Sequence, residues 1–238
     1  MKVLALVPAR SGSKRLLHKN KKLLAGKPLI QWTFDFASHL PDFCDVLLTS
    51  DDPEIIEFSK NLNISAPWVR PAELALDNSS SVDVALHAIN WYEENHGSVD
   101  CLLLLQPTSP IRRISDFQRG IRLFLDFGAA SVVSVAKSET HPMWAYKMDG
   151  AYLKPYLTNS GKSFQSQDLP DSYTPNGAFF FISPSELRNE KAFITDKTVP
   201  LIIEGPVFNL DIDTKEDFDM AQFLIKRSEI QKSEEWIQ

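Results

Sequence analysis

Short apolar runs alternate with helix-like segments along most of this chain of 238 residues, and this alternation constrains the fold more than any other feature. Helical spacing of apolar residues occurs in Pro28–Leu40, Glu54–Leu62, Val82–Tyr92, Asp116–Phe127 and Thr214–Arg227. The runs expected to form strands are Val3–Val7, Val46–Thr49, Trp68–Val69, Cys101–Leu105, Ser131–Val135, Ala178–Ile182 and Val207–Ile212. The pattern predicts an α/β three-layer sandwich with a mostly parallel central sheet, formed by one domain over residues 1–238.

One segment interrupts this rhythm. Between about residues 137 and 176, prolines separate aromatic residues and no helical or strand period is maintained. An irregular stretch of this length is unusual inside a compact domain, so it is either a mobile lid or an arm that docks on another subunit. Aromatic residues are enriched at protein interfaces, which favours an arm that docks on a partner subunit.

Positive charge is concentrated at the start of the chain. The formal net charge is −6, yet the first 34 residues contain eight Lys and Arg and no acidic residue. Within this stretch, residues 8–14 follow the first predicted strand and combine small residues with cations. Ligands of α/β sheets gather at such a position, and a small cationic loop there can hold a polyphosphate. The alternative is a solvated basic turn. Neither P-loop spacing nor a Gly-x-Gly-x-x-Gly motif is present.

Composition excludes several other classes. The basic excess is confined to one segment, which argues against a general nucleic-acid-binding protein. No apolar run approaches the ~20 residues that a membrane-spanning helix needs. The first apolar run is too short for a signal peptide and is followed by Pro8, Arg10 and Lys14. Cys44 and Cys101 lie beside or within apolar runs and are expected to be reduced thiols, so we predict a cytoplasmic protein.

A pair of carboxylates lies near the end of the chain. Asp211 and Asp213 flank Ile212 just before Thr214, where a helix is expected to begin. Alternation along an extended chain puts both carboxylates on one side, where they can share a hard cation. Mg²⁺ is favoured because it accepts few protein oxygens together with phosphate oxygens and water. Alternatively, one Asp caps the helix and the other is merely exposed. The Asp-x-Asp-x-Thr sequence also resembles the nucleophile loop of haloacid-dehalogenase-type phosphatases, in which it follows the first strand.

Two further segments contain candidate ligand contacts. Gln106 follows an apolar run and can offer both a donor and an acceptor, although the segment can equally be a polar turn between prolines. Arg70 can contact a ligand or form an ion pair with Glu73 or Asp77. The serines at 79–81 can contact a ligand or cap the helix that follows them.

Five segments, taken in order, resemble the bacterial CMP-sialic acid synthetases, also called acylneuraminate cytidylyltransferases. They are residues 8–14 with Lys19-Asn20, residues 70–75, residues 104–110, residues 168–170 with 176–178, and residues 211–214. The resemblance extends from residue 3 to about residue 225. It implies a nucleotide-diphospho-sugar transferase-like fold and the reaction of CTP with a 2-keto-3-deoxy nonulosonic acid, which yields a CMP-sugar and pyrophosphate. It also implies Mg²⁺ as cofactor and a homodimer whose arm, residues 137–176, covers the neighbouring subunit's site.

The resemblance also implies roles for individual residues, among which Arg10, Lys19 and Asp211 are expected to act in catalysis. The residues expected to bind the nucleotide are Arg10, Ser13, Lys14, Lys19, Asn20, Arg70, Ser79 and Ser81. Gln106 and Asn176 are expected to contact the sugar acid, and Asp211 and Asp213 to bind Mg²⁺.

Two positions depart from the family pattern. Ser166 and Trp144 stand where relatives often carry Arg and Lys, the candidate partners of the sugar carboxylate. Lys147, Lys162 or another cation is therefore expected to substitute, or the sugar differs. N-acetylneuraminate, legionaminate, pseudaminate and an octulosonate relative all stay open, and the match at 176–178 favours the sialic and legionaminic acids. Two other functions are weighed against this one: a sugar-phosphate phosphatase of the Asp-x-Asp type and a non-catalytic CTP-binding protein.

Overall fold

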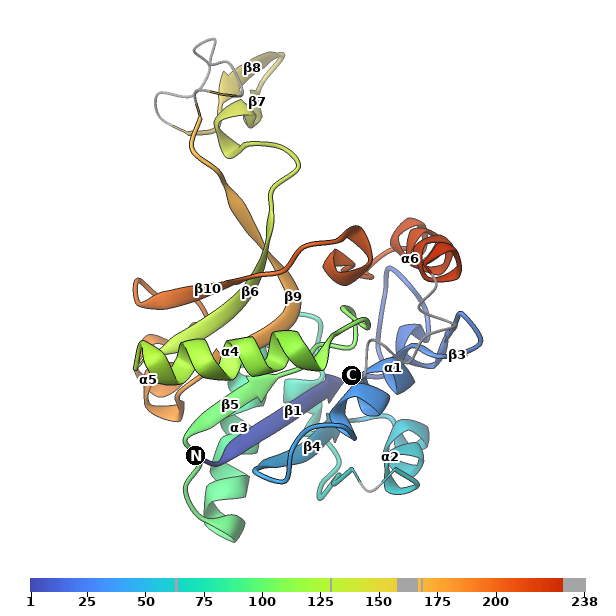
Figure 1. Ribbon diagram of the computed structural model, residues 1–238. Helices are drawn as coiled ribbons and strands as arrows, with labels where there is room; N and C mark the ends of the chain where they lie inside the picture. The colour runs from blue at the N-terminus through green and yellow to red at the C-terminus, as the bar shows by residue number, and fades with distance from the viewer. Residues whose placement is uncertain (63, 129, 158–166, 168, 229–238) are drawn as a thin grey trace.

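A six-stranded sheet forms the centre of the computed structural model, which describes residues 1–62, 64–128, 130–157, 167 and 169–228 (Figure 1). The strand order is β10-β6-β9-β5-β1-β4, and β9 alone runs antiparallel to its neighbours in this sheet. The strands are β1 Val3–Ala9, β4 Cys44–Ser50, β5 Cys101–Leu104, β6 Ser131–Lys137, β9 Tyr173–Ile182 and β10 Thr198–Ile202. The predicted mostly parallel sheet is confirmed.

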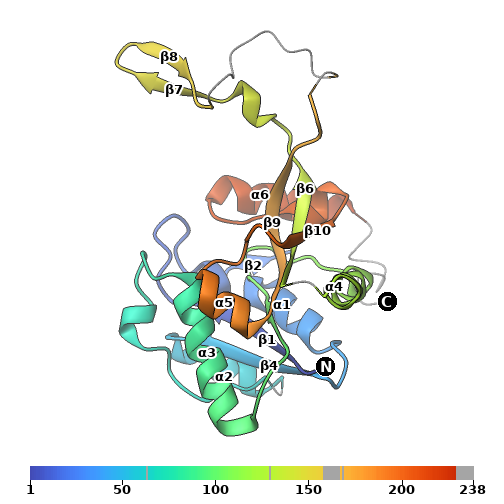
Figure 2. The ribbon, with the colours of Figure 1, turned by 90° about the vertical axis from the view of Figure 1, so that its left-hand side faces the viewer.

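Helices cover both faces of the sheet because successive strand residues point to opposite sides. Val3, Ala5 and Val7 of β1 pack in one apolar cluster with residues of α1, α2 and α4. Leu4 and Leu6 pack on the other face, in a cluster with residues of α3 and α5 (Figure 2). The three layers predicted from the sequence are therefore present. The helices are α1 Leu29–Ala37, α2 Pro53–Lys60, α3 Ser81–His96, α4 Ile114–Asp126, α5 Pro184–Glu190 and α6 Lys215–Arg227.

A third apolar cluster joins the two ends of the chain. Helix α6 begins with a capping box, in which the Thr214 side chain accepts from the backbone N–H of Asp217 and the Asp217 side chain accepts from that of Thr214. The apolar residues of α6 pack on segments close to the N-terminus, including the short hairpin of β2 Leu23–Leu24 and β3 Lys27–Pro28. Cluster members include Leu16, Leu24, Leu29, Trp32, Val207, Ile212, Phe218, Ala221 and Ile225.

Two of the predicted strands are wrong. Trp68–Val69 contributes only an isolated bridge. The run Val207–Ile212 begins inside a 3-10 turn, Pro206–Asn209, and its apolar side chains enter the third cluster instead of the sheet. The sheet also contains one strand that was not predicted, β10, which includes Pro200 and lies at the edge. Proline lacks the N–H that a central strand needs but is tolerated in an edge strand, so it concealed this strand in the sequence.

An arm leaves the sheet where β6 and β9 continue beyond the other strands (Figures 1 and 2). It carries an antiparallel hairpin of β7 Tyr146–Asp149 and β8 Tyr152–Pro155. The segment predicted to be irregular thus contains regular strands, although residues 158–166 and 168 lie outside the described part of the chain. At the base of the arm, the pairing of β6 with β9 shifts register between Val133 and Val135, so that residues 176–179 of β9 bulge opposite Ser134 of β6.

Among the described helices, none combines the length and the hydropathy needed to cross a membrane.

Candidate active site

The candidate site lies where the loops after β1, β4 and β5 converge at the carboxyl edge of the sheet, which is the usual ligand position in such folds. A cleft of about 320 Å³, here called the Arg70 cleft, opens there. It brings together residues from both ends of the chain, so that Arg10 and Asp213 share one cavity. Its polar lining consists of Arg10, Lys19, Asn20, Arg70, Asp77, Ser79, Ser81, Gln106, Thr108 and Asp213.

The cations of the first loop are paired with two carboxylates. Arg10 Nη1 lies 2.9 Å from Asp77 Oδ1, and Lys14 Nζ lies 2.5 Å from Asp77 Oδ2. Hydrogen bonds and charge from Lys14 and Arg10 lower the pKa of Asp77 below its ordinary value. Lys19 Nζ lies 2.9 Å from Asp213 Oδ1 and also donates to the Ile212 carbonyl at 3.0 Å. These two carboxylates therefore form ion pairs with the same cations that could bind a polyphosphate.

The conformation of the loop is held by neighbouring polar groups. Asn20 Nδ2 donates to the Arg10 carbonyl at 3.2 Å, so Asn20 supports the loop backbone as well as lining the cleft. The backbone N–H of Ser11 donates to Asp51 Oδ1 at 2.7 Å, which ties the loop to the end of β4. Ser13 does not line the Arg70 cleft. It lines a separate cavity of about 330 Å³ that also includes Arg10, Lys14 and Asp213.

Arg70 forms a buried wall of the cleft. Its Nε donates to Thr49 Oγ1 at 3.1 Å and its Nη2 donates to the Thr49 carbonyl at 2.5 Å. Burial lowers the pKa of Arg70 to about 10, which leaves the guanidinium charged at neutral pH. Arg70 therefore does not form the ion pair with Glu73 or Asp77 that the sequence left open.

The serines at 79–81 divide into two roles. Ser80 caps α3, because its Oγ accepts from the backbone N–H of Val82 at 3.1 Å. Ser79 and Ser81 line the cleft, and Ser79 Oγ donates to the Glu73 carbonyl at 2.8 Å. The predicted nucleotide contacts are thus the two serines that do not supply the helix cap.

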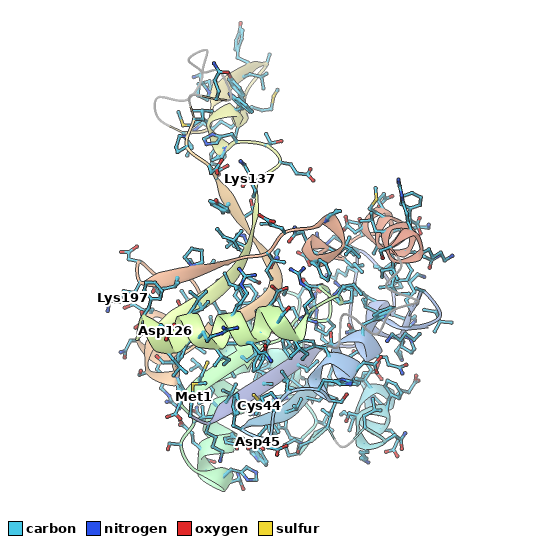
Figure 3. The ribbon with its side chains drawn as sticks, viewed as in Figure 1. Met1, Cys44, Asp45, Asp126, Lys137 and Lys197 are labelled. Carbon is cyan, nitrogen blue, oxygen red and sulfur yellow. The ribbon has the colours of Figure 1, made fainter. Side chains whose placement is uncertain are left out.

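A second cavity, of about 740 Å³ and here called the Asn176 cavity, contains Asn176, Asp211 and Lys137 in its lining. Lys137 lies at the base of the arm (Figure 3). The Asn176 side chain is buried: its Nδ2 donates to Asn209 Oδ1 at 2.9 Å, and its Oδ1 accepts from Ser134 Oγ at 2.6 Å. The structure therefore divides the two predicted sugar-acid contacts, because Gln106 lines the Arg70 cleft and Asn176 the second cavity.

The carboxylate pair is divided in the same way. Asp213 lines the Arg70 cleft, whereas Asp211 lines the Asn176 cavity. Thr108, which lines the Arg70 cleft, hydrogen-bonds Asp211 and so links the two cavities. Desolvation raises the pKa of Asp211 above its ordinary value, and the charges of Asp213 and Asp217 add to this rise. Neither carboxylate of the pair caps α6, because Thr214 and Asp217 form the cap.

Sequence reasoning missed three contributors. Asp77 was considered only as a partner of Arg70, whereas it holds Arg10 and Lys14. Arg15 Nη2 lies 2.7 Å from Asp213 Oδ2. Thr108 lines the Arg70 cleft and hydrogen-bonds Asp211, which lines the Asn176 cavity. No local pattern distinguishes these residues, since each acquires its partner only through the fold.

Comparison with known proteins identifies the class and then the family. The class is that of an α/β sandwich with a mostly parallel sheet, and the same fold occurs in the solved structure of CMP:2-keto-3-deoxy-manno-octonic acid synthetase complexed with CTP. That structure aligns with a TM-score of 0.69 at 17% identity and covers 95% of this chain and 99% of its own. The cytidylyltransferase family profile matches residues 4–136. The chain belongs to the cytidylyltransferase family of nucleotidyltransferases.

Relatives with different names align over most of this chain. The CMP-N,N'-diacetyllegionaminic acid synthase of Legionella pneumophila is 31% identical over 228 residues, which cover 95% of this chain and 97% of that protein. The pseudaminic acid cytidylyltransferase of Campylobacter jejuni is 30% identical over 226 residues, with coverage of 95% and 97%. The N-acylneuraminate cytidylyltransferase of Streptococcus agalactiae serotype III is 34% identical over 221 residues, and the chain spans about half of that protein's length (52%).

Asp77→Asn is expected to tighten the binding of inorganic pyrophosphate, because an amide does not compete for Arg10 and Lys14. Exposed ion pairs are individually weak, so we expect the Kd measured by isothermal titration calorimetry to fall about two- to fivefold. The matched control is Asp219→Asn, which removes the exposed pair between Asp219 and Lys215 on α6 and should leave the Kd unchanged. Weaker binding by Asp77→Asn would show that Asp77 organises the cations instead of competing for them.

Proposed function

We propose that this protein activates a nonulosonic acid with CTP, forming a CMP-sugar and releasing pyrophosphate. The observation that carries the proposal is the Arg70 cleft, where cations that begin at Arg10 meet a carboxylate some two hundred residues later in the chain. Relatives named for the activation of legionaminic, neuraminic and pseudaminic acids support the same reaction class. CTP is a cytoplasmic metabolite, so we place the reaction in the cytoplasm.

The nucleotide is assigned to the Arg70 cleft. The triphosphate is assigned to Arg10, Lys14 and Lys19, with Ser13 and Asn20 supporting the loop. The cytidine is assigned to the part of the lining that contains Arg70, Ser79, Leu74 and Leu76, because it combines apolar surface with donors. The cleft thus offers charge for the phosphates and a mixed surface for the nucleoside.

In the proposed reaction, the anomeric hydroxyl of the sugar acid attacks the α-phosphorus and the bond to the leaving pyrophosphate breaks. Negative charge develops on the pyrophosphate, so catalysis depends mainly on positioning and charge neutralisation. Lys19 is suited to this role because its side chain is only 13% exposed and is held by Asp213 and the Ile212 carbonyl. Arg10 supplies a second cation from the same loop.

We assign Mg²⁺ to Asp211 and Asp213. The donor chemistry fits, because two carboxylates stand two residues apart and the charge of Asp213 contributes to the raised pKa of Asp211. To share a cation with Asp211, Asp213 would exchange its ion pairs with Lys19 and Arg15 for the metal. Within the described part of the chain, no group of three or more His, Cys, Asp or Glu side chains is arranged to hold a metal. Two carboxylates suit Mg²⁺, which commonly completes its shell with phosphate oxygens and water. When bound, the ion would neutralise charge on the reacting phosphates.

The sugar acid is assigned to the region between Gln106 and the Asn176 cavity. Among the described residues lining that cavity, Lys137 is the one cation, and it lies 2.6 Å from Asp171. We assign the sugar carboxylate to Lys137. Of the cations expected from the sequence, Lys147 lies on β7 of the arm and is not among the residues that line this cavity, while Lys162 falls outside the described residues, as does Ser166.

A substrate panel tests the function. Each nucleoside triphosphate is incubated with Mg²⁺ and each of N-acetylneuraminate, N,N'-diacetyllegionaminate, pseudaminate and 2-keto-3-deoxyoctulosonate, and pyrophosphate release is measured alongside mass spectrometry of the product. We expect release with CTP only, and with a nonulosonic acid. Hydrolysis of sugar phosphates without nucleotide would instead support the phosphatase, and CTP binding without turnover would support a non-catalytic protein.

Asp211→Asn and Asp213→Asn are expected to lower kcat by on the order of 100-fold or more while shifting stability in opposite directions. The pKa of Asp211 is raised in the folded protein, so its ionisation opposes folding at neutral pH, and Asp211→Asn should raise Tm by on the order of 2–4 °C. This gain should shrink as the pH falls through the pKa of Asp211. Asp213→Asn loses the ion pairs with Lys19 and Arg15 and should lower Tm. Near-full activity of both variants at saturating Mg²⁺ would refute the metal assignment.

We also propose a homodimer held by the arm. Large apolar side chains at its end are exposed in the single chain, including Tyr146, Met148, Tyr152, Leu153 and Tyr156. Exposed apolar surface of this kind marks an interaction site.

In sedimentation velocity, the wild type should be a dimer and the double variant Tyr152→Glu/Leu153→Glu a monomer, because burying two carboxylates in an apolar contact is unfavourable. Leu125→Glu, at an exposed apolar position on α4, is the control. A monomeric wild type would contradict the proposal.

A further inference from the structure

Arg112 is the largest fully buried side chain of the described residues, with 1% of its surface exposed. Its guanidinium forms no ion pair with a carboxylate in the described part of the chain. Burial lowers the pKa of Arg112 to about 9, which leaves the group charged at neutral pH. A buried charge is costly unless hydrogen bonds compensate it, so the contacts of this side chain indicate what it is for.

Three donors of Arg112 bind three different elements. Nη2 donates to the Gln106 carbonyl at 2.6 Å, just after β5. Nε donates to the Ala178 carbonyl in β9 at 2.8 Å, and Nη1 donates to Thr33 Oγ1 in α1 at 3.1 Å. The guanidinium is a rigid planar fork, so these bonds fix the distances between the groups that they join.

Both carbonyls belong to segments that contain a predicted sugar-acid contact. One carbonyl is that of Gln106 itself, and the other lies two residues after Asn176. Ser109 strengthens the same junction, because its Oγ donates to the Asn176 carbonyl at 2.9 Å. Gly177 between them has φ +76°, and a Cβ added there would overlap Ser109 and lie 3.2 Å from Gln106 Oε1. The 106–109 and 176–178 segments are therefore packed in direct contact.

We propose that Arg112 is a positioning residue for the sugar-acid half of the site, acting by holding Gln106 and Asn176 at a fixed separation without touching substrate. The inference rests on the proposed function. Arg70 is its counterpart for the nucleotide, since this second buried arginine is bound to the end of β4 through Thr49. Each half of the site thus has its own buried guanidinium. Substituting Arg70 should weaken the binding of CTP, and substituting Arg112 should weaken the binding of the sugar acid.

The test is a comparison of Michaelis constants for CTP and for the sugar acid that the panel identifies. Arg112→Met should raise KM for the sugar acid by on the order of tenfold or more, because small misplacements of binding groups are costly. Its KM for CTP should change less than about twofold. Arg70→Met, the matched variant of a buried arginine, should show the reverse pattern. Arg112→Lys keeps the charge but lacks the planar fork, so it should restore part of the sugar-acid affinity at most.

Thermal unfolding of each variant checks that it folds. If Arg112→Met does not fold, Arg112→Lys and Ser109→Ala carry the test, since each weakens the junction more gently. Equal increases in both Michaelis constants, or an unchanged constant for the sugar acid in these variants, would overturn the inference. Wild-type turnover is measured first: its absence with every sugar acid refutes the proposed function and this inference with it, whereas turnover with the wrong pattern of constants refutes the inference alone.

Discussion

The packing of α6 against segments near the N-terminus is the interaction on which the site depends. Phe218, Ala221 and Ile225 of α6 share an apolar cluster with Leu24 and Trp32. This burial holds the 211–213 segment beside the first loop, where Lys19 reaches both Asp213 and the Ile212 carbonyl. The ion pairs themselves are partly exposed and individually weak, so it is apolar burial that brings the opposite charges together.

The charged residues of the site have an electrostatic cost, which internal ion pairs reduce. Asp211 is harder to ionise than an ordinary aspartate, because it is desolvated and lies near two other carboxylates. Asp77 and Asp213 bind four cations of the first loop between them. Internal ion pairs thus hold the cations to which we assign the triphosphate and one of the carboxylates to which we assign Mg²⁺. Binding is therefore an exchange of partners, which limits the electrostatic cost of keeping the cations close together.

The sequence predicted those parts of the structure that local patterns determine. The continuous apolar run Val3–Val7 and the helical spacing in Pro28–Leu40 both follow from which side chains must be buried, and both elements are present. The run Val207–Ile212 looked like a strand because it is apolar, but its burial is against α6. Thr198–Ile202 was hidden by a proline that only an edge position tolerates. Edge position is a property of the whole sheet and cannot be read from one segment.

The candidate site was predictable to a similar extent. Arg10, Lys19 and Asp213 were singled out because their residue types and motifs are distinctive, and the fold places all three at one cleft. The roles of Asp77 and Arg112 could not be found in this way. An aspartate in a loop and an arginine after a proline-rich turn have no distinguishing local pattern. Asp77 binds Arg10 from 67 residues away, and Arg112 binds Ala178 and Thr33 at separations of 66 and 79 residues.

Strand β9 has a consequence for how such an enzyme can change over time. It starts in the arm, bulges at residues 176–179 opposite Ser134, and ends in the core between β5 and β6. One strand thus contributes both to the arm and to the lining of the Asn176 cavity. A bulge bends the strand that contains it, so a substitution there is expected to change the direction of the arm and the shape of this cavity together. Under the proposed function, the subunit contact and the sugar preference depend on the same few residues of β9.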